Sequence, residues 1–299
     1  MSWVSDMAHT PVLLNKVLEI FSPTSGEFII DGTMNGGGHA SEIIKKIAPH
    51  GIFLGVDLDR EMISDAKKRF SGNKSVDINL AESNYTEIPV ILKNKKLGKA
   101  DGLLLDLGFS SNQLKSGRGF SFKKDEPLLM TYDNDYQTAA EVVNGLSEKE
   151  LADIFYKYGE ERRSRQIAKR IVEARKKKRI MTTGELVEII RGTVGKSYEG
   201  GRIDPSTRVF QALRIYVNRE LENLSQVLAE LKDILKPGGI AIIISFHSLE
   251  DRLVKQAFRQ MEKDGVAEIL TKKPVTADPE EQRDNPRSRS AKLRAIVMK

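Results

Sequence analysis

The 299-residue sequence contains no cysteine. This absence excludes disulfide bonds and zinc sites built from thiolates, and it is typical of proteins in a reducing compartment. Histidine is also scarce, because only His9, His39, His50 and His247 are present, far apart in the sequence. A metal site would therefore depend on carboxylates, and no pattern of acids indicates one. We expect no metal.

Long hydrophobic runs are missing as well. No apolar run approaches the roughly 18 residues that a membrane-spanning helix requires. The segment from Met1 to His9 has no basic stretch followed by an apolar one, which is the pattern of a secretory signal peptide. Hydrophobic residues make up 39% and charged residues 30% of the chain, as in ordinary globular proteins. We therefore expect a cytoplasmic protein that contacts no membrane.

Positive charge is in excess and unevenly distributed. The formal net charge is +6, and the segment from Arg162 to Arg179 holds ten Lys or Arg and a single acid, Glu173. A mild excess of this kind favours a polyanionic partner such as nucleic acid. The segment has two interpretations: a surface that contacts phosphates, or a solvated helix face.

A glycine-rich turn near the start of the chain predicts a nucleotide site. Residues 28–31 form an apolar run that ends in Asp31, which is typical of a buried strand. Four glycines lie between residues 32 and 38, and residues 40–47 carry apolar side chains at helical spacing. Strand, glycine turn and helix form the ligand-binding unit of open α/β sheets. Glycine allows close approach of the backbone, and the helix N-terminus offers free N–H groups.

Two further apolar runs, at residues 52–57 and 102–107, carry Asp57 and Asp106 at their ends. Asp57 lies about 20 residues after the glycines, where an acid can bind ribose hydroxyls. The carboxyl ends of parallel strands share one edge, so Asp31, Asp57 and Asp106 should lie together there. An acid that opens the turn suits a ligand with positive charge, such as S-adenosylmethionine, better than a pyrophosphate. Tyr85, after the third predicted strand, either covers an adenine ring or packs on its own loop.

The alternation of strands and helices stops after residue 113 and resumes near residue 204. Between them, residues 114–203 show helical spacing and helix start signals, among them the capping box from Ser147 to Glu150. Beyond them, apolar positions from Leu213 to Leu235 predict one long helix, followed by strands at 240–246 and 292–298, the latter at a sheet edge. Residues 264–290, which are polar with prolines and charges, predict an extended or mobile loop. We therefore predict an α/β domain, 1–113 and 204–299, with an inserted helical domain, 114–203.

Several long motifs resemble the bacterial 16S rRNA cytosine-N4 methyltransferases, and the resemblance extends from His9 to Arg294. The matching segments are Asp31-Gly32-Thr33 with Gly37-Gly38-His39, Leu105 to Gly108 with Ser110, Ser111 and Gln113, Arg118 to Phe122, Tyr158 to Glu161, Thr207 to Ile215 without Val209, Val217-Asn218 with Glu220-Leu221, Ser245 to Arg252 and Asn285 to Arg294.

The resemblance implies a Rossmann-like class I methyltransferase sheet with an inserted all-helical domain that recognises substrate. It implies S-adenosylmethionine as the methyl donor and, as the target, a cytidine of 16S rRNA at the decoding centre of the small ribosomal subunit. By analogy, the residues that contact the donor are Gly37, Gly38, His39, Asp57, Tyr85, Asp106 and Gln113.

The sequence departs from the family pattern at four positions. Asn35 replaces a usual glycine, Leu129 and Thr131 replace a usual Asp and Arg, and Asp204 replaces a frequent histidine before the proline. The change at Leu129 and Thr131 leaves open what the insert does at the active site or with RNA.

Methylation of N4 needs help because the lone pair of this nitrogen is delocalised into the cytosine ring. A carboxylate that accepts a hydrogen bond from N4–H would localise the lone pair, and Asp106 stands at the strand end where such a group is needed. His247, after the strand at 240–246, is the second catalytic candidate, or else it only holds its loop. Phe109 and Phe120 are either stacking partners for the base or core residues.

Two other functions stay open at this point. A nicotinamide-dependent dehydrogenase would share the fold, but the sequence lacks the dinucleotide fingerprint. A non-enzymatic RNA-binding or ribosome-assembly factor that keeps the fold is compatible with the altered segment at Leu129 and Thr131.

Overall fold

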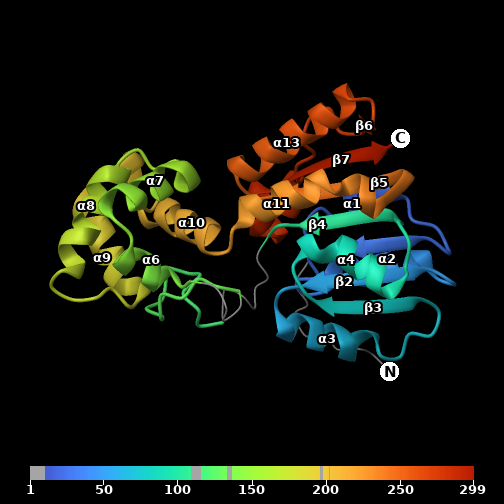
Figure 1. Ribbon diagram of the computed structural model, residues 1–299, viewed down its shortest axis with the longest axis horizontal. Helices are drawn as coiled ribbons and strands as arrows, with labels where there is room; N and C mark the ends of the chain where they lie inside the picture. The colour runs from blue at the N-terminus through green and yellow to red at the C-terminus, as the bar shows by residue number, and fades with distance from the viewer. Residues whose placement is uncertain (1–10, 109–115, 133–136, 196–197, 202) are drawn as a thin grey trace. The chain divides into compact units, whose positions relative to one another are not determined.

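The computed structural model describes residues 11–108, 116–132, 137–195, 198–201 and 203–299. The chain forms two compact units (Figure 1): a sheet unit made of Met1–Ser110 and Leu221–Lys299, and a helical unit, Ser111–Glu220. The helical unit therefore ends at Glu220, beyond the boundary at residue 203 that the sequence predicts. The reason is that α10 (Ser206–Val217) packs against α7 (Glu148–Gly159).

The sheet has seven strands in the order β3-β2-β1-β4-β5-β7-β6. Their bounds are β1 Phe28–Asp31, β2 Ile52–Asp57, β3 Asp77–Glu82, β4 Ala100–Asp106, β5 Leu235–Ser245, β6 Ala267–Ile269 and β7 Lys292–Met298. Strands β1 to β5 are parallel, whereas β7 runs antiparallel to both of its neighbours, β5 and β6. This doubly wound order reverses between β1 and β4, where such sheets bind ligands.

Two details of the C-terminal region differ from the sequence-based prediction. The strand at residues 292–298 is not an edge strand, because β6 pairs with its outer side. Residues 264–290 are also more ordered than an extended loop, since they include β6, α14 (Pro279–Asp284) and the 3-10 helix η3 (Pro286–Ser290). Both predictions were wrong because β6 has only three residues and leaves a weak sequence signal.

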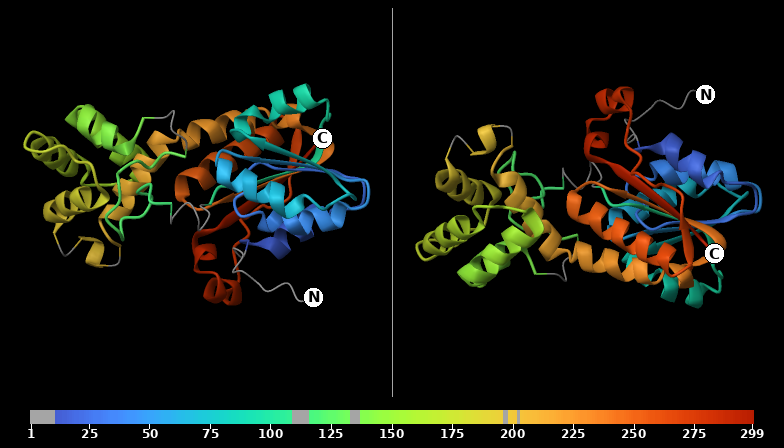
Figure 2. Two further views of the ribbon diagram at one scale, coloured as in Figure 1. Left: turned by 90° about the horizontal axis from the view of Figure 1, so that it is seen from below. Right: turned by 90° about the horizontal axis from the view of Figure 1, so that it is seen from above.

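Helices cover both faces of the sheet (Figure 2). One face packs against α1 (Leu14–Phe21), α2 (Gly38–Ile47) and α3 (Arg60–Phe70). The opposite face packs against α4 (Ile88–Lys95), α11 (Glu220–Ala229), α12 (Leu231–Ile234) and α13 (Ser248–Lys263). The short 3-10 helix η1 (Tyr85–Glu87) leads from β3 into α4. Alternate residues of each strand supply the two cores, as the pleat of a sheet requires.

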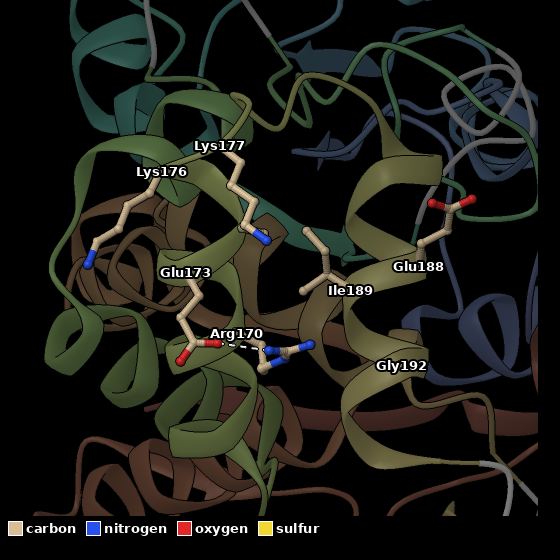
Figure 3. Close-up of a pocket in the computed structure, with 8 residues that line it drawn as sticks. Arg170, Glu173, Lys176, Lys177, Glu188, Ile189 and Gly192 are labelled. Atoms are coloured by element: carbon tan, nitrogen blue, oxygen red, sulfur yellow. Dashed lines mark hydrogen bonds and ion pairs between the residues drawn. The ribbon is translucent and has the colours of Figure 1, made fainter.

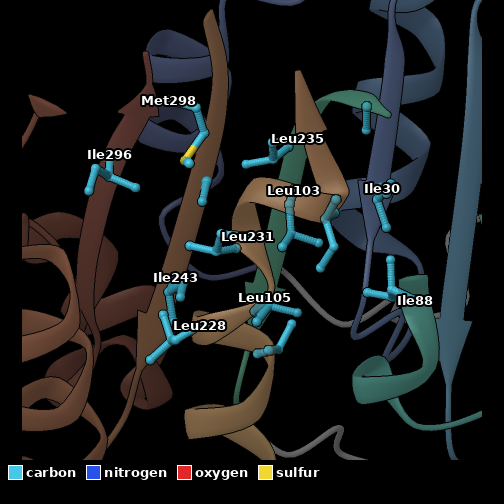
Figure 4. Close-up of a cluster of buried hydrophobic side chains, with 14 of the residues drawn as sticks. Ile30, Ile88, Leu103, Leu105, Leu228, Leu231, Leu235, Ile243, Ile296 and Met298 are labelled. Carbon is cyan, nitrogen blue, oxygen red and sulfur yellow. The ribbon is translucent and has the colours of Figure 1, made fainter. Parts of the chain in front are cut away.

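The core on the side of α4, α11, α12 and α13 includes Leu103 and Leu105 of the central strand β4, and both side chains are inaccessible to solvent (Figure 4). Leu103 and Leu105 of β4 lie beside Ile30 of β1 and Ile243 of β5 in this cluster. Burial on both faces explains why β4 is a continuous apolar run in the sequence. It also explains why Asp106 follows the run directly, at the point where the strand leaves the core.

The helical unit contains α6 (Ala139–Gly145), α7, α8 (Ser164–Arg175), α9 (Thr183–Val194), the 3-10 helix η2 (Tyr198–Gly201) and α10. Capping boxes begin α6, α7 and α9, and that of α7 is the predicted pair Ser147 and Glu150. The single helix that the sequence predicts from Leu213 to Leu235 is instead three helices, α10, α11 and α12. The helix is interrupted after Asn218, because Arg219 has a left-handed backbone with φ 52°.

No helix in the described parts of the chain has the length and apolar character that crossing a membrane would require.

Candidate active site

Three buried carboxylates meet at the carboxyl edge of the sheet. Asp31, Asp57 and Asp106 are the last residues of β1, β2 and β4, which are neighbours in the sheet. Each is at most 7% exposed to solvent. The structure thus brings together the three acids that the sequence predicts at one edge.

Burial disfavours the charged forms of two of these acids. It raises the pKa of Asp31 well above the usual value, and the charges of Asp106 and Asp57 add to the effect. Burial also raises the pKa of Asp57 to about 7, although N–H groups of Asp59 and Asn35 act in the opposite direction. Among the residues that the structure describes, Asp31 and Asp57 have no cationic partner. A ligand with hydroxyl donors or positive charge would supply the missing partners.

The glycine-rich turn connects these strand ends through hydrogen bonds. The N–H of Asn35 donates to the Asp57 carboxylate at 2.8 Å, and its side-chain amide donates to the Asp106 carbonyl oxygen at 3.1 Å. The hydroxyl of Thr33 accepts the Asp106 N–H at 2.6 Å. Asn35 has φ 47°, a left-handed conformation that Asn tolerates better than other residues with a Cβ. Asn35 therefore fits the position where the family usually has glycine, and it adds a bond between strands.

The glycines predicted to contact the donor have structural reasons of their own. Gly37 precedes α2 with φ 71°, a conformation that favours glycine. A Cβ at Gly38 would lie 3.1 Å from the ring of Pro11, so glycine allows Pro11 to pack closely against the start of α2. Arg69 donates to the carbonyl oxygen of Gly36 at 2.6 Å and holds the turn from α3. The turn is thus fixed before any ligand binds.

His39 is buried and faces Asp106. Its Nε2–H donates to the carbonyl oxygen of Val12 at 2.9 Å, which leaves Nδ1 directed at the Asp106 carboxylate, 3.8 Å away. This geometry suits a residue that positions Asp106 as well as one that touches a ligand. The donor contact predicted for His39 stays a prediction.

Tyr85 and Gln113 complete the predicted donor contacts. Tyr85 begins η1 just after β3 and is half-buried against the core beside α4. Its packing against this core does not decide between the two roles, and the contact with an adenine ring stays a prediction. Gln113, Phe109, Ser110 and Ser111 lie outside the described residues.

His247 serves as the N-cap of α13. Its Nδ1 accepts the Glu250 N–H at 3.4 Å, while the Glu250 carboxylate accepts the N–H groups of Phe246 and His247. Nε2 lies 3.1 Å from the same carboxylate, without the alignment of a hydrogen bond. This capping box accounts for His247 as a loop-holding residue, and its catalytic role stays a prediction.

Sequence reasoning did not single out the roles of Thr33, Asn35 and Arg287. Burial lowers the pKa of Arg287 from its usual value, and the nearby charge of Asp106 partly offsets this effect. A cation therefore stands close to the candidate catalytic carboxylate. The only available signal was its place in the matching segment from Asn285 to Arg294.

In the helical unit, the two altered family positions belong to a well-ordered segment. Leu129 accepts the Ala139 N–H, and Thr131 is buried. Asn218 donates to the carbonyl oxygen of Met130 at 2.7 Å. The predicted stacking residue Phe120 lies against the ring of Tyr132, with centroids 5.3 Å apart. Loss of the usual Asp and Arg has therefore not left this segment unstructured.

Asp204, the fourth departure from the family pattern, is also accounted for. It pairs with Arg191 at 2.6 Å and accepts the Ser206 N–H at the start of α10. The ion pair and these hydrogen bonds hold the pKa of Asp204 below its usual value, although burial acts in the opposite direction. The aspartate therefore joins α9 to α10.

The ten cations of residues 162–179 differ in their surroundings. Four of them are anchored by partners within the helical unit: Arg163 on the Val194 carbonyl, Arg170 on Glu173, Arg175 on the Val143 carbonyl and Lys178 on Glu185. The side chains of the other six make no hydrogen bond or ion pair within the described chain: Arg162, Arg165, Lys169, Lys176, Lys177 and Arg179.

Comparison with known proteins identifies the family of this chain. The model of the MraW methylase family matches residues 6–299. Ribosomal RNA small subunit methyltransferase H of Coprothermobacter proteolyticus is 47% identical over 290 residues, which cover 96% of this chain and 95% of that protein. The protein of the same name from Persephonella marina is 44% identical over 287 residues, covering 96% and 97%.

Among solved structures, an rRNA methylase from Streptococcus thermophilus matches with a TM-score of 0.47 and 7% identity, covering 97% of this chain and 99% of that one. A putative rRNA-methylase from Clostridium thermocellum matches with a TM-score of 0.44 and 10% identity, covering 97% and 100%. The family assignment depends on the sequence matches alone. On the strength of those matches over nearly its whole length, the chain belongs to the MraW methylase family and is a methyltransferase.

Proposed function

We propose that the protein transfers a methyl group from S-adenosylmethionine to the exocyclic N4 of a cytidine in 16S rRNA, at the decoding centre of the small ribosomal subunit. Its relatives carry the name ribosomal RNA small subunit methyltransferase H, and the matching motifs extend along nearly the whole chain. The observation that carries the proposal is the set of three buried carboxylates at the sheet edge. An enzyme acting on small subunits would work in the cytoplasm.

The residues at this edge fit S-adenosylmethionine. Asp57 would accept hydrogen bonds from the ribose hydroxyls, and an ammonium or sulfonium group beside Asp31 would stabilise the ionised form of this carboxyl group, which burial disfavours in the free protein. Gly37 and Gly38 would bring the backbone close to the ligand, with Tyr85 near the adenine. When bound, the donor supplies a methyl group made electrophilic by the positive sulfur.

Asp106 is the group best placed to act on the substrate amine. Its carboxylate would accept a hydrogen bond from the N4–H group of cytosine, and this contact would localise the nitrogen lone pair. The same carboxylate would then receive the proton. Its N–H donates to the Thr33 hydroxyl and its carbonyl oxygen accepts from the Asn35 amide, so its backbone is fixed, and His39 faces its side chain at 3.8 Å. Such fixed placement matters because alignment of amine and methyl group supplies much of the rate.

The target cytidine must lie outside a base stack to reach this edge. The six cations of residues 162–179 whose side chains make no hydrogen bond or ion pair within the described chain suit contacts with rRNA phosphates, which provide affinity without reading sequence. The helical unit would therefore hold the RNA while the sheet unit performs the chemistry.

The test is methyl transfer from radiolabelled S-adenosylmethionine to small subunits that lack the modification. We expect label in 16S rRNA, mapped by nuclease digestion and mass spectrometry to one N4-methylated cytidine. Label on another base, or on a ribosomal protein, would refute the assignment of the target. Absence of transfer by a protein that binds the donor would refute the function.

A further inference from the structure

The last turns of α7 carry an exposed aromatic ring beside a group of arginines. Tyr156 is 66% exposed, and it is the only aromatic residue among the large hydrophobic side chains that stand exposed in the described chain. It lines a cleft of about 530 Å³ together with Asp153, Arg162, Arg163 and Arg165. We call these five residues the Tyr156 platform. A tyrosine ring left in water contributes little to folding, so its position points to a binding role.

The turn between α7 and α8, which carries Arg162 and Arg163, is held in place by a buried acid. Glu161 is inaccessible to solvent, and its carboxylate accepts hydrogen bonds from the Arg163 N–H and the Tyr198 hydroxyl. Its own N–H donates to the carbonyl oxygen of Phe155 at 3.1 Å. The ring and the guanidinium groups therefore project from a fixed backbone, which lowers the entropy that a bound partner must remove.

The charge of the platform suits a polyanion. Three arginines stand against one carboxylate, Asp153. Arg163 donates to the carbonyl oxygen of Val194 at 2.9 Å, whereas Arg162 and Arg165 are exposed and make no ion pair with the part of the chain that the structure describes. Two guanidinium groups next to a flat ring match the phosphate and the base of one nucleotide.

A second groove on the same unit lacks this combination (Figure 3). It lies between α8 and α9, has a volume of about 590 Å³, and includes Lys176 and Lys177 but no aromatic residue. Two acids also line it: Glu173, which pairs with Arg170 at 2.8 Å, and Glu188. This groove therefore offers cations to a phosphate but no ring on which a base could stack.

We propose that the Tyr156 platform binds an unpaired nucleotide of the substrate RNA, with its base stacked on Tyr156 and its phosphate on Arg162 and Arg165. The proposal builds on the proposed function, because it names a surface by which the helical unit holds the rRNA. Single-stranded segments are the form in which RNA offers unstacked bases to proteins. Stacking on an aromatic ring tolerates any base, so the platform adds affinity rather than sequence choice.

Direct binding tests the platform without any methyl transfer. The probe is a fluorescein-labelled oligoribonucleotide of about twelve nucleotides without secondary structure, and its anisotropy is followed with the full-length protein at several salt concentrations. We expect Tyr156→Ala to weaken binding about 10-fold, since base stacking is lost. Tyr156→Phe keeps the ring and should bind within about twofold of wild type. Thermal melting followed by circular dichroism checks that both variants are folded.

The arginines are tested by the salt dependence of binding. The double variant Arg162→Gln with Arg165→Gln should reduce the slope of log affinity against log salt by about 0.7, because the contact with one phosphate of a single strand is lost. The matched control is Lys272→Gln with Lys273→Gln, which removes the same charge from an exposed turn of the sheet unit. We expect the control to retain the wild-type slope.

The outcomes separate this proposal from the proposed function. If the oligonucleotide does not bind wild type, or binds Tyr156→Ala as tightly as wild type, the platform is not an RNA site, whatever the methyl-transfer assay reports. If Tyr156→Ala weakens binding to whole subunits but not to RNA, the partner is a ribosomal protein and the proposal is wrong. If wild type transfers no methyl group while the platform variants still lose RNA affinity, only the proposed reaction fails.

Discussion

Donor binding should depend on pH through Asp57. In the free protein burial raises the pKa of this carboxylate to about 7, so near neutral pH half of the molecules carry it protonated. A ribose hydroxyl donates to the charged form more strongly than to the acid, so bound donor should lower the pKa of Asp57 toward its usual value of 3.8. Affinity for S-adenosylmethionine should therefore rise with pH and level off above about 8.

The size of the effect follows from the shift. Below pH 7, each decrease of one pH unit should weaken donor binding up to about tenfold, or roughly 1.4 kcal/mol. This weakening continues until the pH reaches the pKa that Asp57 has in the donor complex. Isothermal titration calorimetry between pH 5.5 and 8.5, in buffers of different ionisation enthalpy, measures both affinity and proton release. We expect about half a proton released per donor near pH 7 and almost none at pH 8.5.

The variant Asp57→Asn should bind S-adenosylmethionine weakly at every pH. It should also lose the part of the pH dependence that comes from ionisation of Asp57. Asp31 would supply any slope that remains, since burial raises its pKa as well. The matched control is Asp77→Asn, which removes an exposed acid at the start of β3 and should leave the profile unchanged. An affinity that is constant over this pH range, or a slope in Asp57→Asn as steep as that of wild type, would refute the ribose role.

The same raised pKa predicts the stability of the free protein. Between pH 4 and 7 the folded state holds the proton of Asp57 more tightly than the unfolded state, whose pKa is near 3.8. The free energy of unfolding should thus fall as pH rises through this window, by up to about 4 kcal/mol for the three-unit difference, and then become level. Urea denaturation without donor measures it, and saturating donor should reduce the loss.

Three further predictions concern single contacts. Asp106→Asn should lower kcat for methyl transfer by about 100-fold or more and leave RNA affinity unchanged, as measured by single-turnover kinetics and filter binding; wild-type kcat would remove Asp106 from the mechanism. Asn35→Ala should cost about 1–2 kcal/mol in urea denaturation, because alanine is strained at a left-handed φ and the amide bond to β4 is lost, whereas Asn35→Gly should cost less. Lys176→Gln with Lys177→Gln should flatten the salt dependence of subunit binding without changing donor affinity, and an unchanged slope would show a merely solvated face.

The sheet could be predicted from the sequence wherever a strand is buried on both faces. The runs ending at Asp31, Asp57 and Asp106 are continuous and apolar, and the structure has strands at all three. Because parallel strands share their carboxyl edge, the meeting of the three acids followed from these runs and from the strand order alone.

The end of the helical unit could not be predicted in the same way. Apolar residues from Leu213 to Leu235 keep helical spacing across the break after Asn218, so periodicity alone shows one helix. The break depends on the left-handed backbone of Arg219 and on Asn218, which bonds to Met130 far away in the sequence. Interactions of that kind have no local signal.

The site shows the same division. Residue types at strand ends predicted the acids, but the amide bond from Asn35 to Asp106 needs a specific left-handed turn. Likewise, the capping role of His247 depends on Glu250, and its place after a strand suggested chemistry just as readily.

The basic segment shows why charge should be sorted by contact before it is tested. Replacing Arg175, Lys176, Lys177 and Lys178 together would remove RNA contacts and internal anchors at once. Arg175 donates to the Val143 carbonyl at 2.7 Å and joins α8 to α6, so its loss would destabilise the helical unit and mimic a loss of binding. Lys178 likewise pairs with Glu185, which begins α9. A variant limited to Lys176 and Lys177 leaves both anchors in place, and only its salt slope reports on phosphate contact.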